Sequence, residues 1–290
     1  MLTTRQMYLT ELCHLYLEYS KVYKKSYRTD CSKISIYIIP LLGGIKLAEV
    51  NRNDIRRYIC ELVNLKSSTK NRHLALIKAI MTFAVEYGYI NTSPAAGIKS
   101  FNEPGSLRRA MEPDEFSMFI KVLQSEALTE KRDTLQLLLL LAFTGMRLGE
   151  ARSARIEDIN IAKKLLHLKD SKAGCDRLVP LCGEAMEVIM AQREIYGQKG
   201  LIFRSRTGGM VTEPRRLMAA LCEKAGIDKF TIHEIRYTAG SAMLAATRDI
   251  YAVKRFLGHK NIKTTERYAQ YFGGQQHEDI EKAMALMLRR

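Results

Sequence analysis

Apolar residues recur at helical spacing along most of the chain, whereas the two-residue alternation of a β-strand is confined to one short stretch. There the helical period changes, and Leu165-His167-Lys169 and Arg177-Val179-Leu181, each spaced at every second residue, flank a turn around Ala173-Gly174, a signal of a β-hairpin. Near the N-terminus four side chains instead follow the spacing of one helical face, namely Tyr8, Leu12, Leu15 and Tyr19. The sequence therefore predicts a mainly α protein with one small β-sheet, an α+β fold.

A short polar segment divides the chain. Residues 99–110 include Pro104 and Gly105 among polar side chains, a composition typical of a linker. The residues before this segment have only helical patterns, and those after it contain both helices and the predicted hairpin. A chain of 290 residues can bury two separate cores. We therefore expect a helical domain at 1–98, a linker at 99–110 and a larger domain at 111–290.

Proline and capping residues predict where helices of the first domain begin and end. A helix over Tyr27–Ile39 is expected to stop at Pro40, because proline lacks the N–H that continues a helix. Asn51, followed three positions later by Asp54, is typical of a helix N-terminus. A last short helix is expected to start at Ser93-Pro94.

The chain is strongly basic, with a formal net charge of +15. This excess favours a polyanionic partner such as nucleic acid, although a solvated basic surface is the simpler alternative. No apolar run is long enough to span a bilayer, and the N-terminus lacks the apolar region of a signal peptide, so we expect no membrane association and a cytoplasmic protein. The six cysteines form no C-x-x-C pair and have no histidines at zinc spacing, which favours reduced thiols over a metal site.

Residues 111–290 contain the side-chain types needed to cut a phosphodiester without a metal. Such a reaction requires a nucleophile, cationic donors for the phosphate oxygens and an acid for the leaving oxygen. Arg147 directly follows an apolar helix, and its guanidinium could make two parallel hydrogen bonds to phosphate oxygens. Lys172, at the tip of the hairpin, could reach a leaving oxygen. For each of them a solvated surface residue is the simpler alternative.

Two histidines and a second arginine could also contact phosphate. His233 and Arg236 are three residues apart, which places them on one face of a helix. His259 follows a helix that ends at Gly258, where it could hydrogen-bond a phosphate oxygen or simply interact with the helix dipole. Alone, each of these signals is weak.

A tyrosine can act as the nucleophile and form a covalent phosphoryl intermediate. Tyr268 ends the sequence Thr-Thr-x-x-Tyr that begins at Thr264. Other tyrosines, Tyr251 and Tyr271 among them, compete on residue type alone. Side-chain chemistry therefore makes a tyrosine nucleophile possible without selecting Tyr268.

Five short motifs, taken in order, resemble those of the tyrosine recombinase (phage integrase) family. Each motif is weak alone, but the five occur in family order with family-like spacing, and the likeness covers residues 111–272. Residues 1–98 also resemble the helical core-binding domain of that family, in a Xer-like two-domain layout. The motifs are Gly-x-Arg-x-x-Glu at 145–150, Lys-x-Gly at 172–174, His-x-x-Arg-x-Thr at 233–238, Leu-Gly-His at 257–259 and Thr-Thr-x-x-Tyr at 264–268.

The resemblance implies a site of six residues with distinct roles. The tyrosine would attack the scissile phosphate and form a 3′-phosphotyrosine, while the two arginines would hold the non-bridging oxygens. The lysine would protonate the 5′-hydroxyl leaving group, the first histidine would assist as a proton acceptor, and the second would hydrogen-bond the phosphate. Neither a metal nor a cofactor is then required. The residues are Arg147, Lys172, His233, Arg236, His259 and Tyr268.

The resemblance also implies a task and partners. The family cleaves and rejoins double-stranded DNA for integration, excision or inversion, working as a tetramer on DNA, in some cases with accessory directionality or DNA-bending proteins. A C-terminal helix, expected here over Glu278–Arg289, often docks on a neighbouring protomer, although packing on its own domain is an equal alternative. Two other functions stay open at this point. They are a DNA-binding regulator without chemistry on the same fold, and a relaxing enzyme resembling type IB topoisomerases.

Overall fold

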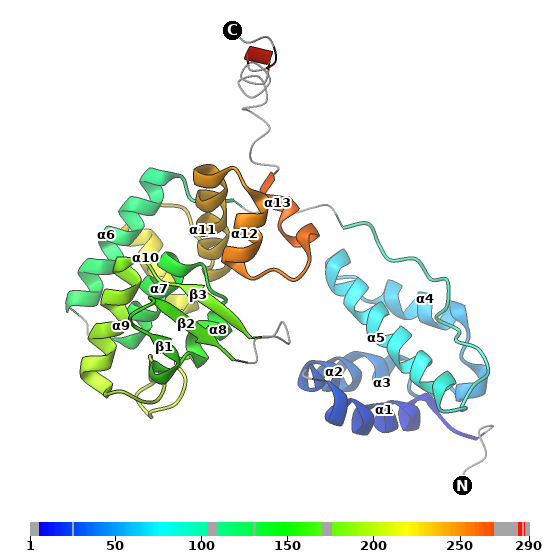
Figure 1. Ribbon diagram of the computed structural model, residues 1–290. Coiled ribbons are helices and arrows are strands. Elements are labelled where there is room, and N and C mark those ends of the chain that lie inside the picture. Colours follow the sequence, from blue (N-terminus) through cyan, green and yellow to red (C-terminus); the bar gives the residue numbers. More distant parts are fainter. Residues whose placement is uncertain are drawn as a thin grey trace. The chain divides into compact units, whose positions relative to one another are not determined.

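In the computed structural model the described residues are 6–24, 26–103, 109–129, 132–169 and 176–269, together with Met284, Ala285 and Met287. The chain divides into two compact units, Met1–Ser106 (unit 1) and Leu107–Arg290 (unit 2) (Figure 1). The division falls inside the segment 99–110. The first residues of that segment are nevertheless attached to unit 1, because the backbone N–H of Phe101 donates to Asn71 Oδ1 at 2.8 Å.

In the described part of unit 1 the regular elements are helices, joined by turns and followed by a non-helical segment over 87–103. A core of aliphatic and aromatic side chains lies between them, in which the rings of Tyr16 and Phe83 meet edge to face with centroids 5.8 Å apart. The helices are α1 (Leu9–Tyr23), α2 (Tyr27–Lys33), a π-helical turn (Ile34–Ile38), α3 (Ile39–Leu42), a 3-10 turn (Leu47–Glu49), α4 (Arg52–Glu61) and α5 (Ser67–Glu86).

The N-terminal helix was predicted correctly, but its buried face was not. α1 buries Leu9, Leu12 and Tyr16, whereas Tyr8 and Leu15 of the expected face are exposed. The observed face also includes Cys13 and Ser20, small side chains that the expected pattern did not count. A helix can therefore be recognised from its period while the direction of its buried stripe is still misassigned.

The helix that begins at Tyr27 does not stop at Pro40, contrary to the prediction. A π-helical turn precedes the proline, with the backbone N–H of Ile39 donating to Ile34 O, and α3 runs through Pro40 to Leu42. The wider π turn changes the hydrogen-bond register just where the proline has no N–H to give. The helix expected at Ser93-Pro94 is also absent, since residues 94–97 form a turn. The predicted N-cap is confirmed, because Asn51 Oδ1 accepts from the N–H of Asn53 at 2.8 Å.

Unit 2 contains helices and one antiparallel sheet of strand order β1-β2-β3 (Figure 1). The predicted hairpin is present as β2 and β3, with Leu166 opposite Val179, and the sequence did not predict the two-residue β1. The elements are α6 (Pro113–Thr129), α7 (Asp133–Thr144), α8 (Leu148–Ser153), β1 (Ile159–Asn160), β2 (Leu165–Leu168), β3 (Arg177–Pro180), α9 (Gly183–Tyr196), α10 (Arg215–Lys224), α11 (Ile232–Thr247), α12 (Ile250–Leu257) and α13 (Glu266–Ala269).

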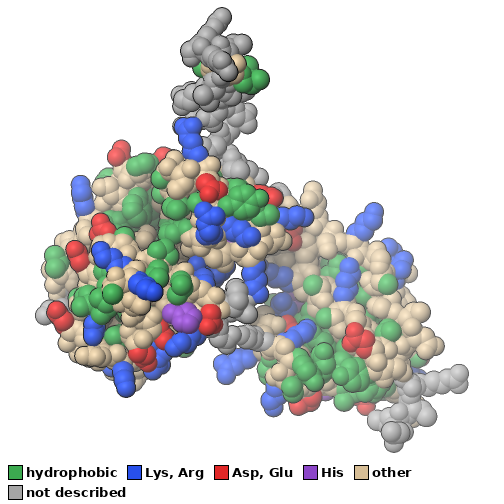
Figure 2. Space-filling view, viewed as in Figure 1, with side chains coloured by type: hydrophobic (Ala, Val, Ile, Leu, Met, Phe, Trp, Pro, Cys, Tyr) green, Lys and Arg blue, Asp and Glu red, His purple; other side chains and the backbone are tan. Residues whose placement is uncertain are grey.

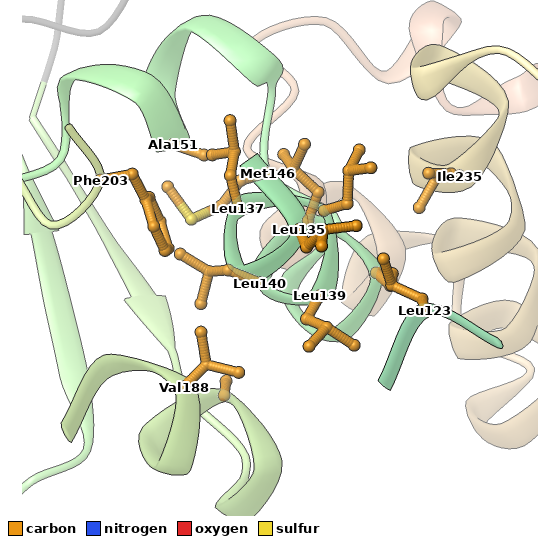
Figure 3. Close-up of a cluster of buried hydrophobic side chains, with 14 of the residues drawn as sticks. Leu123, Leu135, Leu137, Leu139, Leu140, Met146, Ala151, Val188, Phe203 and Ile235 are labelled. Atoms are coloured by element: carbon orange, nitrogen blue, oxygen red, sulfur yellow. The ribbon is translucent and has the colours of Figure 1, made fainter. Parts of the chain in front are cut away.

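Helix α7 lies at the centre of unit 2. Its leucines point in all directions around the helix axis, toward α6, α8, α9 and α11 (Figure 3). Every residue from Leu137 to Ala142 is buried, and a helix that is apolar on every side is stable only when it is enclosed by other elements. Burial of α7 fixes the position of its C-terminal end, from which the chain continues into Arg147.

A second, smaller core joins α11, α12 and α13 in unit 2. It contains Tyr237, Leu244, Val253, Leu257 and Tyr268. These helices contribute most of the candidate site described below, so packing within this core sets the distances between its residues. None of the helices in the described ranges is both long and apolar enough to cross a membrane.

Candidate active site

Arg147 lies at the N-cap of α8, just beyond the end of the central helix α7. Its side chain is 32% exposed. Glu150, one turn into α8, accepts the backbone N–H of Arg147 at 3.0 Å and its Nη1 at 2.7 Å. The buried carboxylate thus orients the guanidinium while leaving part of it open to a ligand.

Arg236 reaches the same region from α11, but its side chain is buried. Nη1 donates to the carbonyl of Gly145 and Nη2 to that of Leu257, both at 2.6 Å. The pKa of Arg236 is lowered to about 10, mainly by burial of the guanidinium and secondly by repulsion from the charge of Arg147. The guanidinium stays charged at neutral pH, in surroundings that do not fully balance its charge.

The C-terminal end of α12 gathers three arginines. Its last carbonyls carry the negative end of the helix dipole. Phe256 O accepts Arg177 Nη1 at 3.1 Å, and Leu257 O accepts Arg236 Nη2. The next carbonyl, that of Gly258, lies 3.5 Å from Arg147 Nη2, at the long limit of a hydrogen bond. Three guanidinium groups from α8, α11 and β3 therefore converge on successive carbonyl groups of a single helix end.

His259 follows directly after this helix end and is buried. Its Nδ1 lies 2.9 Å from the hydroxyl of Thr265, which orients the ring. Burial and the charges of Arg236, Arg147, Arg267 and Arg177 lower the pKa of His259 to about 4. The imidazole is therefore neutral at physiological pH. When the Thr265 hydroxyl donates to Nδ1, the other ring nitrogen carries a proton and can donate to an anion.

Tyr268 lies on the short helix α13, beside these groups, and is only 4% exposed. Its ring stacks on that of Tyr237, with centroids 4.6 Å apart, and lies 6.3 Å from the His259 ring. A Cβ atom at position 240 would come within 2.6 Å of Tyr268 Cε1, so Gly240 leaves room on α11 for the phenol. The tyrosine is thus held in one position from two sides.

Four of the six predicted residues, Arg147, Arg236, His259 and Tyr268, are therefore brought together around the end of α12. His233 is exposed in the first turn of α11, one turn before Arg236. Lys172 lies outside the described residues. Among the residues that the structure describes, no group of three or more His, Cys, Asp or Glu side chains is arranged to hold a metal ion.

Arg177 belongs to this cluster but was not predicted from the sequence. Its side chain is 11% exposed, and Nη2 pairs with Glu150 Oε2 at 2.9 Å. Although burial opposes it, Arg177 and Arg147 together hold the pKa of Glu150 below its ordinary value. One signal was available in the sequence. Arg177 and Val179 share a face of strand β3, and an inward-facing valine implies an inward-facing arginine.

Comparison with known proteins identifies the family. The family model described as "Phage integrase family" matches residues 109–273, which is more than half of the chain. The chain belongs to the phage integrase family. The matched range contains all six residues that the sequence motifs singled out.

Named relatives of this phage integrase family member include tyrosine recombinases. The chain is 25% identical over 276 residues to "Tyrosine recombinase XerC" of Pelobacter propionicus, which covers 89% of this chain and 87% of the relative. It is 30% identical over 189 residues to "Tyrosine recombinase XerA" of Pyrococcus furiosus, covering 63% of this chain and 64% of that protein.

Solved structures of two integrases have the same fold as this family member. The Tn1549 transposon integrase in complex with transposon right end DNA aligns with a TM-score of 0.77 at 16% identity, covering 98% of this chain and all of the other. The lambda integrase tetramer bound to a Holliday junction aligns with a TM-score of 0.73 at 18% identity, covering 91% and 77%. At these identities the likeness establishes the shared fold.

Proposed function

We propose that this chain is a site-specific DNA recombinase that cleaves and rejoins DNA strands through a 3′-phosphotyrosine intermediate. The observation that carries the proposal is the convergence of Arg147, Arg236, His259 and Tyr268 at the end of α12. These are residue types that a metal-independent attack on a phosphodiester requires, and they come from separate segments of the chain. Family membership supports the same reaction.

In the proposed cleavage step Tyr268 Oη attacks the phosphorus, forming the new O–P bond while the bond to the 5′-oxygen breaks. The phenolic proton passes to a base, for which we propose His233. Lys172 supplies a proton to the departing 5′-oxygen. Attack by a second 5′-hydroxyl reverses the step and releases the tyrosine, so strands are rejoined without an energy source.

The two arginines suit the stabilisation of a phosphate whose oxygens gain negative charge. A preorganised donor of this kind contributes roughly 3–4 kcal/mol to transition-state stabilisation. Arg236 is anchored to two carbonyl groups, which balance only part of the positive charge that its burial removes from water. An anion bound beside it therefore lowers the energy of the site. Arg147 has solvent-exposed surface through which a phosphate can approach. His259, neutral and hydrogen-bonded to Thr265, supplies a third donor without adding charge.

We further propose that the two units hold double-stranded DNA, with unit 1 serving as a core-binding domain. We retain the division into domains 1–98 and 111–290 for this purpose. The net charge of +15 supports phosphate contacts, and Lys and Arg side chains are distributed over the visible face of each unit (Figure 2). Affinity is then expected to fall as salt rises.

The assembly and the biological task extend this proposal. A tetramer on DNA is expected by analogy with lambda integrase, whose structure contains a tetramer on a Holliday junction. Integration, excision or inversion of a DNA segment in the cytoplasm is the corresponding task. We propose accessory directionality or DNA-bending proteins as additional partners. The C-terminal helix expected over 278–289 lies largely outside the described residues.

A selection for covalent attachment tests the proposed reaction even though the target sequence is not specified in advance. The protein is incubated with nicked duplexes randomised around the nick, in the presence of a chelator. A nick beside the cleavage point lets the short 5′-hydroxyl fragment diffuse away and traps the intermediate. We expect wild type to become linked to a subset of sequences in a form that survives denaturant. Tyr268→Phe is expected to form no such adduct while binding the recovered duplexes normally.

Two results would contradict the proposal in different ways. DNA binding without any covalent product would point to a regulator on the same fold. Rapid relaxation of supercoiled plasmid without sequence preference would point to topoisomerase-like activity.

A further inference from the structure

Arg177 occupies a position that neither side-chain chemistry nor the resemblance assigned. It lies at the start of β3, and its side chain, 11% exposed, packs its guanidinium against α8 and α12. Nη2 donates to Glu150 Oε2 at 2.9 Å, and Nη1 donates to the carbonyl of Phe256 at 3.1 Å. Its Nε is buried and has no hydrogen-bond partner among the described residues.

The space for this guanidinium depends on a glycine. A Cβ atom on Gly258 would lie 2.5 Å from Arg177 Nη1 and 2.9 Å from Cζ. Any side chain there would push the guanidinium away from both of its partners. The backbone of Gly258 is also in the left-handed region, with φ at +65°, which a residue with a side chain rarely adopts. The helix end and the arginine therefore fit each other closely.

Glu150 connects Arg177 to Arg147. The Oε2 atom of Glu150 accepts from Arg177 and from the backbone N–H of Arg147, while Oε1 accepts from the Arg147 guanidinium at 2.7 Å. A carboxylate held from two directions has little freedom to rotate. The guanidinium of Arg147 is thus oriented by a group that Arg177 holds in place.

Stability alone accounts poorly for this arrangement. Burying an ion pair costs desolvation that its attraction seldom exceeds, and apolar residues of similar volume are often as stable or more so. Here the buried carboxylate of Glu150 and the mostly buried guanidinium of Arg177 meet the partly exposed Arg147 beside the candidate phosphate site. An unpaired Nε adds a further cost. A role in the reaction explains why the charges occur at this place.

We propose that Arg177 is a positioning residue of the recombinase, which orients the Arg147 guanidinium toward the scissile phosphate by holding Glu150. This inference rests on the proposed function. It differs from a role for Arg177 in the leaving-group step, which its place on β3, the hairpin strand C-terminal to Lys172, would otherwise suggest. It also differs from a purely structural role in holding β3 against α12.

The test compares cleavage of two versions of one duplex recovered by the covalent-attachment selection. One version has the natural 5′-oxygen at the cut, and the other has sulfur in its place. A thiolate leaves without a proton, so the sulfur version restores cleavage to a variant that lacks only the leaving-group acid. Single-turnover cleavage rate, DNA affinity and melting temperature are measured for wild type, Arg177→Gln, Arg177→Lys, Lys172→Ala and Arg155→Gln. Arg155, which forms an exposed ion pair with Glu157, provides the matched control.

We expect Arg177→Gln to cleave about 10²-fold more slowly than wild type, as a displacement of about 1 Å in an active-site group can cause. Its DNA affinity should stay near that of wild type, and sulfur should not restore its rate. Arg177→Lys should be impaired as well, because an ammonium cannot reach Glu150 and Phe256 O in the fork geometry of a guanidinium. Combining Glu150→Gln with Arg177→Gln should add little to the loss from either alone. Lys172→Ala should recover on the sulfur duplex, and Arg155→Gln should match wild type.

Three results would overturn the inference. The first is recovery of Arg177→Gln on the sulfur duplex, which would assign Arg177 to the leaving-group step. The second is a rate loss in both Arg177 variants that disappears when rates are measured well below their melting temperatures, which would make the role structural. The third is a normal rate. Failure of wild type to cleave either duplex would instead contradict the proposed function, so the two ideas fail separately.

Discussion

Arg147 and Arg236, the two arginines proposed to hold the non-bridging oxygens of the phosphate, differ in burial. This difference gives a sharp prediction for Arg147→Gln and Arg236→Gln. Each substitution removes one cationic donor from the proposed phosphate site. Losing one preorganised donor of this kind costs about 10²- to 10³-fold in rate. We therefore expect both variants to lose strand cleavage by at least two orders of magnitude, although their environments in the folded protein are unlike.

Their effects on folding stability should differ, and the contacts allow the sizes to be worked out. Without Arg236, the carbonyls of Gly145 and Leu257 lose their donor, at about 1–3 kcal/mol for each buried acceptor left unpaired. Removing the charge offsets part of this loss. The pKa of Arg236 is lowered to about 10, and each pH unit of displacement is worth about 1.4 kcal/mol, so burial and repulsion by neighbouring arginines together cost this charge roughly 3 kcal/mol. The net loss of unfolding free energy should stay below about 3 kcal/mol.

Arg147→Gln should change stability by no more than about 1 kcal/mol, because this side chain is 32% exposed and Glu150 keeps its contact with Arg177. Urea denaturation gives both unfolding free energies, and single-turnover cleavage of the nicked duplex gives both rates. Cleavage within tenfold of wild type by a folded Arg236→Gln protein would refute the proposal that Arg236 holds the scissile phosphate. Complete unfolding of that variant would refute the energy balance, since the relief of the buried charge would then be too small.

Three further predictions concern pH and local backbone structure. The pKa of His259 lies near 4, below that of an unfolded histidine, so the unfolded chain takes up the proton first on acidification. The unfolding free energy of wild type should therefore fall by up to about 3 kcal/mol between pH 6.5 and 4. Urea denaturation should show a smaller fall for His259→Gln. Asn51→Ala should lower the unfolding free energy of unit 1 by about 1 kcal/mol in thermal unfolding, because the Asn51 side chain caps α4. Asn53→Ala should not lower it, because the Asn53 side chain lies on the same helix but does not cap it. Lys164 has φ at +49°, so Lys164→Gly should stabilise unit 2 by up to about 1 kcal/mol, whereas Lys163→Gly should destabilise it. The same loss of stability on acidification in wild type and His259→Gln would contradict the first prediction. Equal losses in Asn51→Ala and Asn53→Ala would contradict the second. A change of the same sign in Lys164→Gly and Lys163→Gly would contradict the third.

Patterns that depend on local chemistry were sufficient to predict much of the fold. The hairpin strands follow from the two-residue spacing beside a turn, and the N-terminal helix follows from helical period, both of which are properties of neighbouring residues. The α1 face was misassigned because period alone does not tell which of two overlapping apolar stripes meets the core. Pro40 was misread because the π turn before it depends on how the segment packs, which no local rule contains.

The candidate site could also be predicted only in part, because sequence motifs do not contain the tertiary contacts between distant residues. Motifs and their order selected Arg147, Arg236, His259 and Tyr268, and these are the residues gathered at the end of α12. Arg177 was missed because the role that we propose for it depends on tertiary contacts with Glu150 and Phe256, which are distant in sequence. The low pKa of His259 could not be predicted either, since it results from burial and from arginines of several elements.

The identity of the nucleophile is the central claim, because several tyrosines are chemically capable of the reaction. Wild-type protein trapped on the nicked duplex can be digested with trypsin and nuclease, and the tyrosine that carries the residual nucleotide located by peptide fragmentation. We predict that the 3′-phosphate is attached to Tyr268, with no adduct on Tyr251, which is 59% exposed. An adduct on Tyr251, Tyr271 or any other residue would contradict it.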